Sequence, residues 1–108
     1  MARPDAYAGR VWIAALELDL LLGDVHSLKS KRALVRPLVK EVRRRYDVAA
    51  AEVDHLDLHR RAGIGVTCVA ADRAHVVEVL DAVERFVAAR PEVDLLQTHR
   101  DIRTTTDD

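Results

Sequence analysis

Residues 11–22 alternate between two faces with a period of two, which is typical of a β-strand. One face is apolar throughout and consists of Trp12, Ala14, Leu16, Leu18 and Leu20. The other face begins with Val11, Ile13 and Ala15 but continues with Glu17 and Asp19. The pattern predicts a strand that buries one face completely and the other face only over its first half. Gly23 and Asp24 end it.

The period changes to 3.6 from residue 28 onward, which predicts a helix over 28–46 with Ser27 as its N-cap. Its apolar arc consists of Leu28, Val35, Leu38, Val39, Val42 and Tyr46. A second amphipathic helix follows Asp72 and ends near Arg90 and Pro91, with an apolar face that contains Val76, Leu80, Val83 and Val87. Pro37 lies inside the first helix, where it either kinks the helix or opens a second piece.

Three further strands complete the pattern: a short one within 47–54, one over 63–70, and a last one around Val93, Leu95, Leu96 and Ile102. The resulting order, strand-helix-strand-strand-helix-strand, predicts an α+β, ferredoxin-like fold. In this fold both helices cover one face of a four-stranded antiparallel sheet. We expect a single domain over 11–103, a flexible segment over 1–10 and a frayed tail over 104–108.

The formal net charge of the 108 residues is −1, but the charges are segregated. Residues 29–45 hold eight Lys or Arg and one acid, so this segment carries +7 and the rest of the chain carries −8. On the predicted helix, five of these cations fall on one arc beside the apolar arc. We call Lys29, Arg32, Arg36, Lys40 and Arg43 the basic stripe.

The basic stripe favours contact with phosphate groups, because aligned cations create a local positive field whatever the net charge. Arg44 extends the stripe toward the helix C-terminus, and we count it with the five as a candidate RNA contact. A solvated face whose cations offset the helix dipole is the alternative. The chain has four aromatic residues, Tyr7, Trp12, Tyr46 and Phe86, so base stacking on the sheet is not expected.

Three motifs resemble the YlxP-like family of small bacterial proteins of unknown function. They are Ser27-Leu-Lys-Ser-Lys-Arg, Ala51-Glu-Val-Asp-His-x-Asp-Leu and Asp72-Arg-Ala-His-Val-x-Glu-Val-Leu-Asp, within about residues 11–102. The resemblance implies a ferredoxin-like fold and, through the translation-factor genes that often neighbour such genes, a role near the ribosome. It implies no catalytic or binding residues. The chain departs from the family at His59 and Arg60, where Trp and Gln are usual, and at Pro37.

The sheet face opposite the helices is predicted to be too apolar to remain wet in a small domain. Its candidate contact residues are Val11, Ile13, Ala15 and Val69. A second copy of the chain would cover them, so we expect a homodimer, with a partner protein as the alternative occupant.

His55, Asp57 and His59 fall on one side of an extended segment and are weak candidates for a metal site, since two imidazoles and a carboxylate can ligate one ion. A polar loop in which Glu52, Asp54 or Asp57 pairs with Arg60 and Arg61 is the favoured interpretation. The single cysteine, Cys68, lies on the apolar side of a strand and is expected to be inert.

No motif indicates catalysis, a cofactor or a small-molecule substrate. One cysteine excludes a disulfide-built secreted scaffold, and residues 1–10 do not resemble a signal peptide. We therefore expect a non-enzymatic, cytoplasmic accessory protein that contacts structured RNA or a ribosomal particle through its basic helix. The alternatives are a homodimeric protein-interaction module that uses the open sheet face and, least favoured, a metal-dependent enzyme.

Overall fold

The computed structural model describes residues 11–105. Its elements follow one another as β1 (Trp12–Leu22), α1 (Leu28–Tyr46), β2 (Ala49–Asp54), β3 (Arg61–Ala70), α2 (Arg73–Ala88) and β4 (Val93–Thr104). This is the predicted order. The segment 1–10 and residues 106–108 of the expected tail lie outside the described residues, and β4 continues one residue beyond the expected end of the domain at 103.

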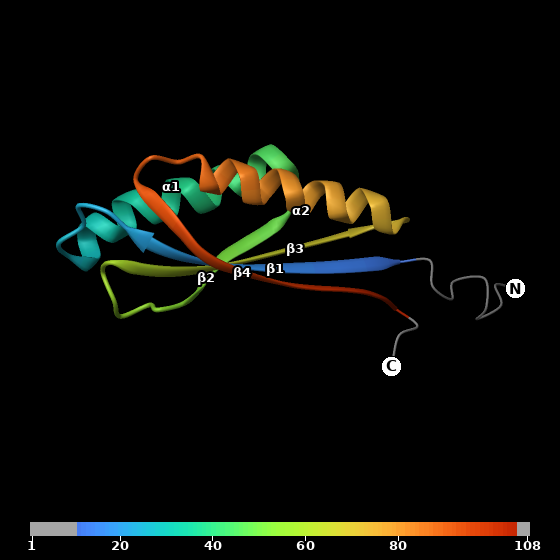
Figure 1. Ribbon diagram of the computed structural model, residues 1–108, viewed down its shortest axis with the longest axis horizontal. Helices are drawn as coiled ribbons and strands as arrows, with labels where there is room; N and C mark the ends of the chain where they lie inside the picture. Colours follow the sequence, from blue (N-terminus) through green and yellow to red (C-terminus); the bar gives the residue numbers. More distant parts are fainter. Residues whose placement is uncertain (1–10, 106–108) are drawn as a thin grey trace, which may run out of the picture.

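The four strands form one antiparallel sheet in the order β2-β3-β1-β4. Figure 1 shows both helices on one side of this sheet, while the other side carries no element. The prediction of an α+β, ferredoxin-like arrangement is therefore confirmed. We call the uncovered side the open face.

The core lies between the sheet and the helices. The predicted inward face of β1 is almost completely buried from Ala14 to Leu22, and Ile64 and Val66 of β3 continue the same layer. Val35, Leu38 and Val42 of α1 and Val76, Leu80 and Val83 of α2 close it from the other side. Each period-two or period-3.6 set of apolar residues thus faces the same interior.

The α1 helix is continuous from Leu28 to Tyr46, with Pro37 inside it and exposed. Of the two alternatives, a split helix is excluded. Ser27 caps the helix, because its Oγ accepts the Ser30 amide at 3.0 Å and the Ser30 Oγ accepts the Ser27 amide at 3.2 Å. This reciprocal capping box fixes the start of α1 at the predicted residue. Within the described residues, no helix is long and apolar enough to cross a membrane.

Candidate functional site

The basic stripe lies along the exposed side of α1. Its five residues are all exposed and extend from Lys29 to Arg43, which is about 21 Å of helix. Within residues 11–105, no carboxylate pairs with Lys29, Arg32, Arg36 or Lys40. Four cations in a row thus have no ionic partner in the described part of the chain.

The remaining cations of α1 have structural contacts. Arg43, the last residue of the stripe, donates from Nε to the backbone oxygen of Ala50 at 2.9 Å and so occupies an acceptor of the edge strand β2. Arg44 and Arg45 lie 3.8 and 3.6 Å from Glu41, and the Arg45 guanidinium lies 5.0 Å from the Phe86 ring centroid. Arg44 remains exposed, but its charge is partly offset by Glu41, so it contributes less to the field than the four unpaired residues.

A groove of about 460 Å³ runs between α1 and β2. Val35 and Val39 line it together with Ala51 and Glu52 of β2. Arg36, Lys40 and Arg43 line it as well, so three residues of the basic stripe surround a concave surface. A polyanion in this groove would meet cations from one side and the edge of the sheet from the other.

Lys31 is the one cation of α1 that points inward, and only 2% of it is exposed. Its Nζ donates to the backbone oxygens of His55 and Leu58, both at 2.7 Å, and lies 2.7 Å from Glu52 Oε2. That carboxylate oxygen is buried and accepts no hydrogen bond from another described residue. Lys31 therefore holds the β2–β3 loop against the start of α1.

The sequence pattern contains a signal for this contact, although the candidate residues inferred from the sequence do not include Lys31. At 100° per residue, Lys31 falls inside the arc that contains Leu28, Val35, Leu38 and Val42, because it is three residues after the first and four before the second. A cation on an apolar arc requires a buried acceptor. Glu52, on the helix-facing side of β2 with Ala50, supplies it.

The open face carries the predicted contact residues at one end. Ile13 and Ala15 of β1 lie beside Val69 and Thr67 of β3 in the strand register. Val69 is 66% exposed, Val53 is 53% exposed, and Val11 is 39% exposed. A shallow depression of about 480 Å³ lies beside them, and its lining includes Ala15, Ala49, Ala51 and Gly65. Large apolar side chains thus flank a floor of small ones.

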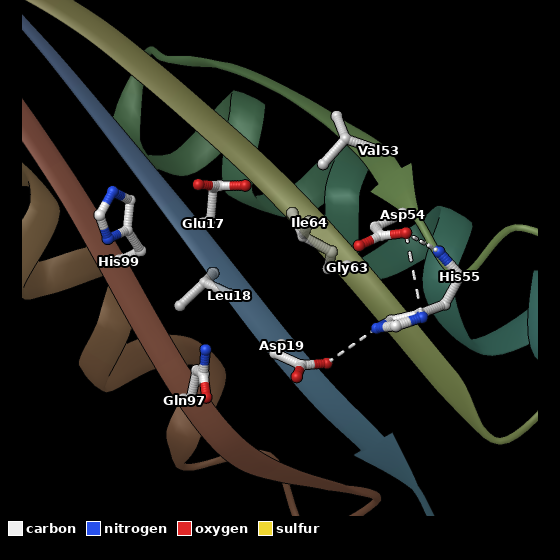
Figure 2. Close-up of a pocket in the computed structure, with 10 residues that line it drawn as sticks. All are labelled: Glu17, Leu18, Asp19, Val53, Asp54, His55, Gly63, Ile64, Gln97 and His99. Carbon is white, nitrogen blue, oxygen red and sulfur yellow. Dashed lines mark hydrogen bonds and ion pairs between the residues drawn. The ribbon is translucent and has the colours of Figure 1, made fainter.

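Figure 2 shows the opposite, polar end of the open face, where a depression of about 270 Å³ is lined by Glu17, Asp19, Asp54, His55 and His99 among others. Arg61 donates to both carboxylate oxygens of Asp19 at 2.7 Å. The His55 Nε2 lies 3.3 Å from Asp19 Oδ1, and the His55 amide donates to Asp54 Oδ1 at 2.7 Å. His55 has a positive φ of 58°, so the contacts of its backbone and its ring hold a strained residue in place.

The structure does not bring the weak metal candidates His55, Asp57 and His59 together. His55 turns toward Asp19 and Arg61, whereas Asp57 and His59 lie on the exposed loop. In the part of the chain that the structure describes, no three His, Cys, Asp or Glu side chains are arranged to hold a metal ion.

The favoured pairing of the loop charges is wrong. Arg61 pairs with Asp19 across the sheet, Arg60 donates to the Leu22 backbone oxygen at 3.1 Å, and Glu52 pairs with Lys31. The reason is that β3 begins at Arg61, two residues before the predicted start. Arg61 therefore lies beside Leu21 in the register and faces the same side of the sheet as Asp19.

No Phe, Tyr or Trp side chain lies on the open face over the described residues. Trp12, Tyr46 and Phe86 pack against the core, and Tyr46 meets Phe86 edge to face at 5.7 Å between centroids. Cys68 lies on the helix-facing side of β3, where burial raises the pKa of its thiol. A raised pKa lowers the thiolate fraction at neutral pH and makes this cysteine a poor nucleophile.

A family model described as "Protein of unknown function (DUF503)" matches residues 13–100, which include every strand and both helices apart from the outer ends of β1 and β4. The chain belongs to the DUF503 family. One similar relative is the uncharacterized protein YlxP of Bacillus subtilis (strain 168). It is 27% identical over 82 residues, which are 76% of this chain and 89% of that protein. Membership in DUF503 agrees with the resemblance found in the three motifs and assigns no activity.

Proposed function

We propose that this DUF503 protein binds the phosphate backbone of structured RNA through the basic stripe of α1, without catalysing a reaction. One observation carries the proposal: Lys29, Arg32, Arg36 and Lys40 follow one another on an exposed helix face, and no carboxylate of the described residues pairs with them. Elsewhere on α1, Arg44 and Arg45 share Glu41, and Lys31 has Glu52.

The spacing of the stripe is unfavourable for the isolated helix. Arg32, Arg36 and Lys40 are separated by four residues each, and like charges at this spacing destabilise a helix by roughly 0.2–0.5 kcal/mol per pair. Bound phosphate groups remove this repulsion, and each contact adds a charge-assisted hydrogen bond. The absence of Phe, Tyr and Trp from the described open face favours backbone contact over base stacking, so binding should depend on salt and little on sequence.

Charge reversal in the stripe tests the proposal. The double variant Arg36→Glu/Lys40→Glu should bind a 20-base-pair RNA hairpin at least tenfold more weakly than the unchanged protein, because two phosphate contacts become repulsions. We avoid Arg43 in this variant because its contact with Ala50 supports β2. Fluorescence anisotropy with the labelled hairpin measures the affinity.

The matched control is Arg73→Glu/Arg85→Glu on α2, which changes the net charge by the same amount at two exposed positions. It should retain the affinity within about twofold. If both double variants lose affinity equally, only the net charge matters and the proposed site on α1 is wrong. The same conclusion follows if the unchanged protein does not bind the hairpin.

A measurement of folding stability tests the repulsion between the cations of the basic stripe. Arg36→Glu replaces two repulsive pairs with attractive ones, to Arg32 and to Lys40, and should raise the free energy of unfolding by about 1 kcal/mol. Urea denaturation followed by circular dichroism measures the change. A variant that is more stable and binds RNA more weakly shows that the stripe serves binding at the expense of stability. A variant that is less stable contradicts the repulsion that we infer.

A further inference from the structure

We infer that the open face is covered by the open face of a second copy of this chain, related by a two-fold axis that runs parallel to the strands between β1 and β3. The inference goes beyond the proposed RNA contact and does not depend on it, because α1 lies on the other side of the sheet.

The area of the open face is sufficient for such a dimer. Eleven residues of β1 extend over about 36 Å, and four strands are about 19 Å wide, so the face has roughly 700 Å². A standard interface buries roughly 600–1,000 Å² on each partner, and the open face falls within this range. The face also carries the most exposed large apolar side chain of the described residues, Val69 at 66%.

The distribution of charge favours a second copy on this face. Four of its charged residues form two internal ion pairs, since Arg61 lies 2.7 Å from Asp19, and Arg103 lies 2.6 Å from Asp101. The α1 side, by contrast, carries four unpaired cations in its described part and would repel its own copy. Two copies therefore meet with less electrostatic repulsion through their open faces than through their α1 sides.

The strand register makes the face complementary to itself about this axis. Rotation about this axis places β1 of one copy over β3 of the other, and β2 over β4. Ile13 of one copy therefore lies opposite Val69 of the other, and the apolar ends of the two faces coincide. Glu17 then lies opposite Gly65, which has no side chain of its own and is flanked by the Val53 side chain. His99, which neighbours Glu17 on β4, lies opposite Ala51 and fills the depression that the small residues leave. An axis perpendicular to the strands would instead place Ile13 against the polar end at Asp19.

Two substitutions on the open face test this dimer. Ala15→Arg places a long side chain into the depression, and Ile13→Glu places a charge in the apolar end; neither residue belongs to the fully buried core. The unchanged protein should sediment as a dimer at 50 µM, and both variants should sediment as monomers with an unchanged circular dichroism spectrum. Arg36→Glu, on the opposite side of the molecule, should leave the dimer intact.

Three results would overturn the inference. An unchanged protein that is monomeric at 50 µM excludes a stable second copy. A dimer that persists in both Ala15→Arg and Ile13→Glu is formed through another surface. A monomer that copurifies with a different protein, and loses it in Ala15→Arg, shows that the open face serves a heterologous partner instead. Because sedimentation is measured without RNA, none of these results depends on the RNA proposal.

Discussion

Lys31→Met is expected to lower the free energy of unfolding by about 3 kcal/mol. The substitution removes the ammonium that contacts Glu52 Oε2 and the backbone oxygens of His55 and Leu58. Removing one partner of a buried ion pair costs about 3–5 kcal/mol, because the remaining charge stays buried and unpaired. We expect the lower end of this range, since Glu52 is 23% exposed and water can reach part of its carboxylate. Urea denaturation measures the change.

Two comparisons identify the cause of this loss. Lys29→Met makes the same chemical change two residues earlier, at an exposed position, and should change the stability by less than about 0.5 kcal/mol. The double variant Lys31→Met/Glu52→Gln should regain part of the loss, because it removes the orphaned charge. Lys31→Met should also accelerate amide exchange at Leu58, whose N–H donates to the His55 backbone oxygen at 3.0 Å. A loss below 1 kcal/mol would contradict the buried pair.

Gly63→Ala is expected to lower the free energy of unfolding by about 2 kcal/mol. A Cβ at this position would lie 2.6 Å from Asp54 Cβ and 3.3 Å from the Asp54 Cα and N. These atoms belong to β2 itself, so the two strands must separate to make room, and such overpacking costs about 1–3 kcal/mol. The shift also displaces the Asp54 carboxylate from the His55 amide. Thermal unfolding and amide exchange at His55 measure both effects.

Gly23→Ala is the matched control for this substitution. Its added Cβ would meet only the Glu92 backbone oxygen, at 3.8 Å, which is ordinary van der Waals contact. It should change the stability by less than about 0.5 kcal/mol. If Gly63→Ala is equally neutral, β2 and β3 are not packed as closely as the structure shows.

The fold could be predicted from the sequence because the period of two in β1 and the period of 3.6 in α1 are uninterrupted along the residues that form the core. β1 alternates without a break from Trp12 to Leu20, and α1 keeps its apolar arc from Val35 to Val42. Local propensity, patterning and capping agree in these elements, so one arrangement satisfies all of them. The open face follows from the same alternation, since its apolar residues lie at the odd positions of β1.

The partners of the charged side chains could not be predicted, because they depend on register and on contacts far apart in the sequence. Arg61 and Asp19 are 42 residues apart and meet only because β3 begins at Arg61. Lys31 and Glu52 meet because α1 crosses the end of β2. The expected pairing joins loop charges that are near neighbours in the sequence, whereas each of these cations is bound by a residue of another element. The exposed position of the basic stripe on α1 follows from helical spacing alone and depends on no tertiary partner.

The salt dependence of RNA binding tests the central claim most directly. If Lys29, Arg32, Arg36 and Lys40 each contact a phosphate, the logarithm of the association constant should fall with the logarithm of the salt concentration at a slope of about −3 to −4. Between 50 and 200 mM salt the affinity for the RNA hairpin should therefore decrease roughly 100-fold, and in Arg36→Glu/Lys40→Glu the slope should approach half that value. A slope near zero in the unchanged protein, or the same slope in both proteins, would contradict phosphate binding by the basic stripe.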